Sequence, residues 1–376
     1  MDKHLHIICL DVPYPPDYGG VYDLFYKLPA LQAQGVKIHL HCFEYGRGEQ
    51  PELNKYCAEV HYYKRDTSYK GVSIKLPYIV YSRRNKELLD ALLKDDHPVL
   101  MEGVHCTYPA MDKRFNDRKK FVRIHNVEHH YYRQLARFTK NPLKKIYYLW
   151  ESKLLKRYEQ QLVNKATAFW AVTKKDSAYF RNKLGCKTVD YLPLFLPPWK
   201  VESKEGMGVF CLYHGNLEVE ENEFAAAWLL QNIFNKIEIP FVIAGKNPSA
   251  SLKKLAYART HIRFVANPSE KKLQDMIATA QINILPSFSD TGIKIKLLNA
   301  LFNGRHCLVN SLMVEGTDLD ELCHVVDGAD AMRERIEQLY HKPFTMEDIE
   351  ARKKVLSSIY NNEASAKQMV KDIWGG

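Results

Sequence analysis

The feature that most constrains the fold is an alternation of short apolar runs with longer amphipathic segments along the chain. In its first instance, the apolar run LHIICL at 5–10 is followed by a turn with Gly19 and Gly20, an amphipathic segment over 21–34, and the apolar run VKIHLHCF. Strand, glycine turn, helix and strand make a βαβ unit, which places both strands parallel in one sheet. The same order returns several times, so the sequence predicts an α/β protein with doubly wound parallel sheets.

A proline-rich stretch divides this alternation into two halves. Residues 191–198, YLPLFLPP, contain three prolines, which disfavour a helix and suit an extended linker. At 376 residues the chain is also too long for one ordinary core. We therefore expect a domain boundary after residue 191, with one α/β domain on each side.

The composition is that of a globular protein, with 46% hydrophobic and 26% charged residues. No apolar run reaches the length of about 18 residues that spans a bilayer, and the N-terminus lacks the features of a signal peptide. The eight cysteines form no CxxC pair and are expected to be reduced core residues. We therefore expect a cytoplasmic location.

Positive charge is concentrated in the first half of the chain. Residues 1–190 contain 33 Lys and Arg against 21 Asp and Glu, a net +12, whereas residues 191–376 contain 21 against 23, a net −2. Basic residues mixed with aromatics in 137–157 suit an anionic membrane surface or a nucleic acid backbone, and a solvated helix face is the alternative. A nucleic-acid function is not expected, because the sequence contains no recognised nucleic-acid-binding module.

The segment 282–304, INILPSFSDTGIKIKLLNALFNG, runs from a strand through a polar turn into a helix that we expect to begin near Gly292. The first amides of a helix are unpaired and favour an anion such as a phosphate. Gly292, Lys296, Asn299 and Asn303 recur at helical spacing and are expected to form one polar face. An ordinary buried strand followed by a surface helix stays open as the alternative.

Other polar candidates follow predicted strands at their carboxyl ends, where ligands bind in open α/β sheets. His125 and Asn126 follow the strand 120–124, and Asn216 and Lys246 end two strands of the second half. The stretch 125–129 also fits H-x-x-E-H, a zinc peptidase pattern. That chemistry needs both histidines on one helix, and His125 is expected to precede the helix, so a zinc site is disfavoured.

Seven stretches, in order, resemble glycosyltransferases of the GT-B fold, in particular the retaining enzymes numbered as family 4. They are YPPDYGG at 14–20, RIHNVEHHYYRQLA at 123–136, the run 150–176, YHGNLEVEEN at 213–222, FVIAGKNPS at 241–249, the run 261–287 and the run 291–316. The resemblance implies two Rossmann-like domains facing a cleft. It further implies an acceptor-binding domain over 1–191, a nucleotide-sugar-binding domain over 192–358 and a C-terminal helix, 359–376, that packs back on the first domain.

The resemblance also assigns roles to residues. His125 would hydrogen-bond the transferred sugar, and Lys296 would stabilise the departing diphosphate, so these two are the catalytic candidates. The other members of the donor site would be Gly19, Gly20, Asn126, Asn216, Lys246, Asp290, Thr291, Gly292, Ile293 and Asn299. The family needs no protein nucleophile, and neither a metal nor a cofactor is implied, because lysines and helix amides face the diphosphate.

The sequence departs from the family at two positions. Many relatives have two glutamates separated by seven residues, and here these positions hold Thr291 and Asn299. A carboxylate binds ribose hydroxyls by about 1.5 to 3 kcal/mol per hydrogen bond, against about 1 for a neutral amide, so Asn299 is expected to weaken donor binding or alter its specificity. Asp290 either restores a carboxylate to the turn or caps the helix.

The expected activity is transfer of a sugar, with retention, from a UDP- or GDP-sugar to a glycan or polyprenyl-linked acceptor in bacterial surface polysaccharide or glycoconjugate synthesis. The basic first domain suggests peripheral contact with an anionic membrane. Two alternatives stay open: a non-catalytic GT-B homologue that binds a glycan or a partner protein, and a sugar-nucleotide epimerase.

Overall fold

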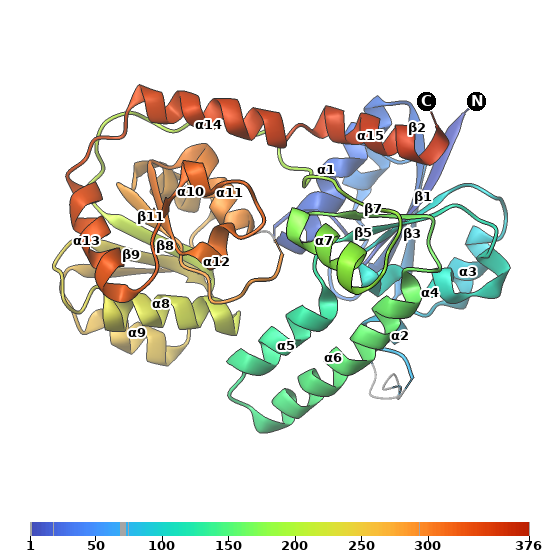
Figure 1. Ribbon diagram of the computed structural model, residues 1–376, viewed down its shortest axis with the longest axis horizontal. Helices are drawn as coiled ribbons and strands as arrows, with labels where there is room; N and C mark the ends of the chain where they lie inside the picture. Colours follow the sequence, from blue (N-terminus) through green and yellow to red (C-terminus); the bar gives the residue numbers. More distant parts are fainter. Residues whose placement is uncertain (1, 18, 68–72, 74, 293, 376) are drawn as a thin grey trace. The chain divides into compact units, whose positions relative to one another are not determined.

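The structure is a computed structural model that describes residues 2–17, 19–67, 73, 75–292 and 294–375 (Figure 1). Contacts divide the chain into two compact units. Unit 1 comprises Met1–Pro197, Thr291–Ile293 and Ile359–Gly376, and unit 2 comprises Pro198–Asp290 and Lys294–Ser358. None of the described helices is long and apolar enough to cross a membrane.

Unit 1 is built on a parallel sheet of seven strands in the order β3-β2-β1-β4-β5-β6-β7. Its strands are β1 (Lys3–Cys9), β2 (Val36–Glu44), β3 (Glu59–Lys64), β4 (Val99–Glu102), β5 (Lys120–Ile124), β6 (Ala168–Ala171) and β7 (Val189–Tyr191). The order reverses between β1 and β4, which is the switch point of a doubly wound fold.

The helices of unit 1 are α1 (Gly19–Ala33), α2 (Tyr78–Tyr81), α3 (Lys86–Leu92), α4 (Tyr108–Met111), α5 (Glu128–Phe138), α6 (Pro142–Leu162), α7 (Lys174–Lys183) and α15 (Asn362–Trp374), with short 3-10 turns at Pro51–Lys55, Val104–Cys106 and Lys113–Phe115. Strand residues alternate between two cores, because successive side chains point to opposite faces of a sheet. One core contains Ile8 and Val122 with Leu155 of α6, and the other contains Ile7 and Phe121.

The C-terminal helix α15 completes the second of these cores. Its residues Ala366, Met369 and Ile373 are fully buried there together with Leu24 and Leu28 of α1. This contact between the last helix and the first confirms the prediction that the C-terminal helix returns to the N-terminal domain.

Unit 2 is built on a second parallel sheet, of six strands, in the order β10-β9-β8-β11-β12-β13. Its strands are β8 (Cys211–Asn216), β9 (Phe241–Lys246), β10 (Ile262–Ala266), β11 (Ile282–Ile284), β12 (His306–Val309) and β13 (His324–Val325). Its helices are α8 (Glu220–Asn232), α9 (Ala250–Tyr257), α10 (Glu270–Thr279), α11 (Ile295–Asn303), α12 (Ser311–Val314), α13 (Ala329–Tyr340) and α14 (Met346–Ile359), with a 3-10 turn at Asp320–Leu322. Both sheets therefore have the predicted Rossmann-like order.

Candidate functional site

Unit 1 gathers five charged or titratable side chains between α1 and the carboxyl ends of β4 and β5. Asp23 and Lys27 lie one turn apart on α1, Glu102 ends β4, Arg123 lies in β5, and His125 follows β5. The first four are completely buried, whereas the side chain of His125 retains 17% of its exposure. Buried charges are tolerated only when they are paired, so the pairing of these groups determines the local structure.

Asp23 is the centre of this cluster. Its carboxylate accepts hydrogen bonds from Arg123 through Nε and Nη2, each at 2.9 Å, from Lys27 Nζ at 3.0 Å and from the backbone N–H of Phe195 at 2.8 Å. Burial by itself would raise the pKa of Asp23, but the charges of Arg123 and Lys27 and the hydrogen bond from His125 hold that pKa well below its usual range. Asp23 is therefore an ionised anchor.

His125 is positioned by two carboxylates. Its Nε2 lies 3.2 Å from Asp23 Oδ2 and 3.5 Å from Glu102 Oε2. Glu102 is itself paired with Lys27. The two carboxylates hold the His125 ring at the carboxyl end of β5, where part of its surface is exposed. The ring is thus oriented in advance to form a hydrogen bond with a ligand.

The carboxylates of Asp23 and Glu102 lie close enough to His125 to hold a metal ion. Lys27 and Arg123 already balance both carboxylates, so a divalent ion would meet no net negative charge. The residues present do not fit a metal in this cluster.

The predicted site residues Gly19, Gly20 and Asn126 also belong to unit 1. The two glycines are the first residues of α1. Burial raises the pKa of Glu128 to about 8, the charge of Glu159 adds to this shift, and a hydrogen bond with the Asn126 side chain opposes it. Asn126 therefore supports the buried start of α5.

The H-x-x-E-H pattern does not form a zinc site. His125 precedes α5, whereas Glu128 and His129 begin that helix. Both ring nitrogens of His129 are engaged, Nδ1 with Glu159 and Nε2 with the Tyr179 hydroxyl at 3.0 Å. The pattern instead joins α5 to α6 and α7.

In unit 2, the turns after β8 and β9 lie side by side. Asn216 accepts a hydrogen bond at its side-chain oxygen from the Glu218 N–H at 3.1 Å, and its carbonyl accepts one from Asn222 Nδ2 at 2.9 Å. A Cβ at Gly245 would lie 2.3 Å from the Gly215 carbonyl oxygen, so only glycine permits this close approach. Lys246 follows Gly245 at the end of β9 and is exposed.

Lys296 lies in the first turn of α11 and is partly buried. Its ammonium donates to Asn222 Oδ1 at 2.9 Å and to the Tyr213 hydroxyl at 3.4 Å, and it lies 5.0 Å from the centre of the Tyr213 ring. Burial lowers the pKa of Lys296 to about 8. The charge of Glu221 raises this pKa, and the charge of Lys294 lowers it further. The ammonium is therefore charged but poorly hydrated near neutral pH.

The turn between β11 and α11 is tied to the start of α8. Ser287 Oγ donates to Glu221 Oε1 at 2.9 Å, and Lys294 Nζ lies 3.9 Å from the same oxygen. Ser289 and Thr291 are buried. The polar turn that was predicted to face an anion thus makes part of its hydrogen bonds within unit 2.

The start of α11 corrects the sequence prediction. The helix begins at Ile295 and its N-cap is Lys294, so Gly292 is not its first residue and Asp290 is not its cap. Gly292 has φ of 60°, a left-handed conformation that ends regular structure. Ile293 lies outside the described residues.

The predicted polar face of α11 is also different from the expectation. Gly292 lies before the helix, and Asn299 is only 8% exposed. Asn299 accepts a hydrogen bond at Oδ1 from Asn303 Nδ2 at 2.8 Å. The two amides are thus bonded to each other within the helix, which accounts for their spacing of four residues.

Sequence reasoning missed Asp23, Lys27, Glu102 and Arg123. Glu102 and Arg123 are charged residues inside otherwise apolar strands, VLME and KFVRI. Asp23 and Lys27 form an i,i+4 pair on an apolar helix. A charged residue inside an otherwise apolar strand or helix therefore indicates a buried ion pair, and the sequence contained this signal.

The chain matches no protein-family model. An uncharacterised 44.6 kDa protein in the cps region of Klebsiella pneumoniae is 26% identical over 328 residues, which cover 83% of this chain and 84% of that protein.

Several solved structures are similar over nearly the whole chain. A mutant of S. aureus TarM in complex with UDP, α-GlcNAc-glycerol and fondaparinux has a TM-score of 0.70 at 9% identity, with 99% of this chain and 100% of that chain covered. WaaG, a glycosyltransferase involved in lipopolysaccharide biosynthesis, has a TM-score of 0.65 at 13% identity, with 99% and 100% covered. The UDP-forming trehalose-phosphate synthase of Burkholderia xenovorans, in complex with glucose-6-phosphate, has a TM-score of 0.63 at 10% identity, with 99% and 100% covered. These similarities confirm the GT-B fold.

Proposed function

We propose that this chain is a glycosyltransferase that moves a sugar from a nucleotide-diphosphate donor to a glycan or lipid-linked acceptor, in bacterial surface polysaccharide synthesis. The GT-B fold over the whole chain carries the proposal. Structures of this fold include proteins that bind UDP, form UDP or build lipopolysaccharide. The relative from a cps region supports the same context.

In unit 2, Lys296 is the proposed partner of the departing diphosphate. A charged ammonium that is partly removed from water interacts more strongly with a phosphate than an exposed one does. Lys246, exposed at the end of β9, is a second cation for the same phosphates, and the turn at Asn216 lies at the end of the neighbouring strand β8. No metal is required in this proposal, because lysines supply the positive charge.

In unit 1, His125 is the proposed hydrogen-bonding partner of the transferred sugar. The carboxylates of Asp23 and Glu102 orient its ring. The bond from the anomeric carbon to the diphosphate breaks, the acceptor oxygen bonds to the same face of that carbon, and the acceptor proton passes to the leaving phosphate oxygen. Configuration is thereby retained without a protein nucleophile. Gly19 and Gly20, at the start of α1, would let the backbone approach the donor.

The acceptor is proposed to lie at an anionic membrane surface, because α6 presents an exposed apolar stripe beside basic residues. Leu143, Ile146 and Leu149 are 76%, 66% and 43% exposed and recur every three residues along one side of the helix. Lys144 and Lys145 are exposed on the same turns. An amphipathic helix of this kind lies in the membrane interface.

A non-catalytic homologue is the second candidate function, and Asn299 is the observation that favours it. Where many relatives have a ribose-binding glutamate, Asn299 is nearly buried and bonded to Asn303. An epimerase finds less support, because the carboxylates Asp23 and Glu102 are paired with Lys27 and Arg123.

Calorimetry and donor hydrolysis with a panel of UDP- and GDP-sugars test the proposal. One donor is expected to bind and to release its nucleoside diphosphate slowly without an acceptor. Lys296→Met should abolish hydrolysis and weaken binding. Lys272→Met is the matched control, since Lys272 is an exposed lysine in the first turn of α10.

Two outcomes distinguish the candidate functions, and a third tests the role of Lys296. Donor binding without hydrolysis or transfer would favour a binding module. Absence of heat from every donor would overturn the enzyme proposal. Unchanged hydrolysis by Lys296→Met would overturn the assignment of the diphosphate to Lys296.

A further inference from the structure

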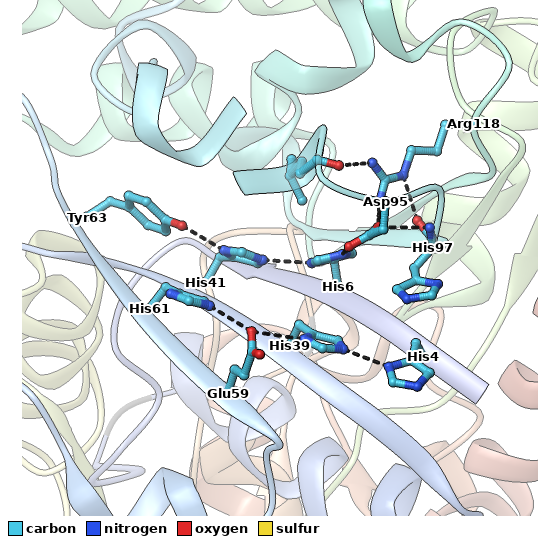
Figure 2. A network of polar contacts seen from close by, with 11 residues as sticks. His4, His6, His39, His41, Glu59, His61, Tyr63, Asp95, His97 and Arg118 are labelled. Atoms are coloured by element: carbon cyan, nitrogen blue, oxygen red, sulfur yellow. Dashed lines mark hydrogen bonds and ion pairs between the residues drawn. The ribbon is translucent and has the colours of Figure 1, made fainter. Parts of the chain in front are cut away.

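A ladder of histidines lies on one side of the three strands β1, β2 and β3 in unit 1 (Figure 2). It consists of His4 and His6 in β1, His39 and His41 in β2, and His61 in β3, joined by His97 from the loop before β4. His6 pairs with His39 and His41 pairs with His61 in the strand register. Polar side chains on a buried sheet require hydrogen bonds or a ligand.

Part of the ladder is satisfied within the protein. His6 Nδ1 lies 2.8 Å from His41 Nε2, and His6 Nε2 lies 3.0 Å from Asp95 Oδ2. His41 Nδ1 lies 2.9 Å from the Tyr63 hydroxyl. Both nitrogens of each buried ring are thus engaged, so these two histidines have a structural explanation.

Three of the other four histidines, His4, His39 and His97, converge on one another. Each is partly buried and offers one ring nitrogen, and the three nitrogens lie within 4.8 Å of one another. His4 Nδ1 is 2.9 Å from His39 Nε2, and the rings of His4 and His97 stack with centres 4.6 Å apart. Two nitrogens bound to one tetrahedral zinc ion at about 2.0 to 2.1 Å lie about 3.3 Å apart. The three nitrogens are therefore close enough to enclose a metal once the stacked rings turn towards a common point.

The carboxylate of Glu59 orients the ring of His39. His39 Nδ1 lies 3.2 Å from Glu59 Oε2, and His61 Nε2 lies 3.1 Å from the same oxygen. A carboxylate behind the second nitrogen of a histidine fixes its tautomer and raises its basicity as a ligand. His39 Nε2 is thereby directed as an acceptor towards His4.

The backbone of His97 is held from both sides. Its N–H donates to Asp95 Oδ1 at 3.0 Å, and its carbonyl accepts from Arg118 Nε at 2.6 Å. Asp95 is paired in turn with Arg118 at 2.7 Å. The loop that carries the third ring is therefore fixed before any ligand binds.

We propose that His4, His39 and His97 form a binding site for a divalent transition metal such as zinc, with Glu59 as the carboxylate behind His39. Neutral imidazoles suit zinc, cobalt, nickel and copper better than magnesium or calcium. Three protein nitrogens leave a fourth position for water or an oxygen ligand. Metal binding at His4 Nδ1 moves the proton of that ring to Nε2, and the metal links β1, β2 and the loop before β4.

This site is separate from the cluster around Asp23. His4 is the second residue of β1, and His97 precedes β4, so the site lies towards the amino ends of these parallel strands. Glu102 and His125 lie at the carboxyl ends of β4 and β5. Metal binding is therefore expected to be independent of donor binding.

The test is calorimetric titration of the chelator-treated full chain with Zn²⁺. One ion should bind per chain and raise the unfolding temperature, and Co²⁺ should give the visible absorption of a four-coordinate nitrogen site. His97→Gln and His39→Gln should each abolish the absorption. Glu59→Gln should weaken binding by about 10- to 100-fold, as expected for loss of a carboxylate behind a metal-bound histidine.

Two controls make the result specific. His61→Gln removes a partly exposed histidine of the same ladder that also contacts Glu59, at 3.1 Å, and should retain the ion. His125→Gln removes the histidine near Asp23 and should also retain it. Circular dichroism confirms that each variant is folded, and the two independent ligand variants guard against failure of one to fold.

No stoichiometric binding by the wild-type chain would overturn the proposal. So would binding that survives both His97→Gln and His39→Gln, or binding that is lost in His125→Gln alone.

Discussion

At the scale of single residues, Lys296 has the environment that most directly affects the proposed donor binding. Burial lowers its pKa to about 8, so the ammonium loses its proton as the pH rises through that value. Donor affinity is expected to be about tenfold weaker at pH 9 than at pH 7, because each pH unit above a pKa removes about nine-tenths of the charged form. The diphosphate of a sugar nucleotide does not titrate in this range.

The measurement is the donor dissociation constant between pH 6.5 and 9.5. Lys296→Arg is the matched variant, since a guanidinium keeps its charge throughout this range. Its affinity should be independent of pH even if it is weaker overall. An equal loss of affinity in Lys296→Arg would assign the titration to another group.

The residues around Asp23 show how far sequence reasoning reaches at this scale. The strand 120–124 and the rule that ligands bind at carboxyl strand ends indicated His125. The partners of His125 come from α1 and β4, and Asp23 is a hundred residues away in sequence. Their proximity depends on the strand order β1-β4-β5, which no local pattern contains.

At the scale of elements, the exposed stripe on α6 permits a direct test of membrane contact. Replacing Leu143 and Ile146 together by Ser should abolish flotation with vesicles of anionic lipid, because burying each of these side chains is worth about 1.5 to 3 kcal/mol. Binding of the wild-type chain should weaken with salt, since the neighbouring lysines contribute about 1 kcal/mol each at low ionic strength.

Val209→Ser is the control, because Val209 is 74% exposed but belongs to unit 2. It should leave flotation unchanged. Absence of wild-type binding at low and moderate salt would contradict the membrane proposal, and unchanged binding by the double variant would exclude α6 as the contact.

The helix α11 illustrates the limit of prediction for elements. Leu297, Leu298 and Leu301 are completely buried, as expected for the apolar side of an amphipathic helix. Its start was predicted too early because glycine was taken as the first helical residue. The left-handed backbone of Gly292 depends on the course of the turn, which the sequence pattern does not specify.

At the scale of the whole molecule, α15 is a distant segment that unit 1 needs for its core. Met369 is completely buried, and Asp372 accepts a hydrogen bond from Trp170 Nε1 at 3.0 Å. Met369→Ala should reduce the free energy of unfolding of unit 1 by about 2 to 5 kcal/mol, because it leaves a cavity. Two units can unfold in separate transitions, and only that of unit 1 should shift in denaturant.

Lys367→Ala is the control on the same helix. Its side chain is 61% exposed and pairs with Glu363, and such surface pairs contribute about 0 to 1 kcal/mol. Equal effects of the two variants would show that α15 does not contribute to the core of unit 1.

The sequence by itself determined the α/β class and the parallel sheets, and its resemblance to the GT-B family implied the return of the last helix. Alternating strand and helix patterns are local, because each depends on residues a few positions apart. Only the tertiary structure decided which polar groups meet: the buried charges around Asp23, the contacts of Lys296, and the convergence of His4, His39 and His97. These contacts depend on strand order, register and burial, which bring together residues that are far apart in the chain.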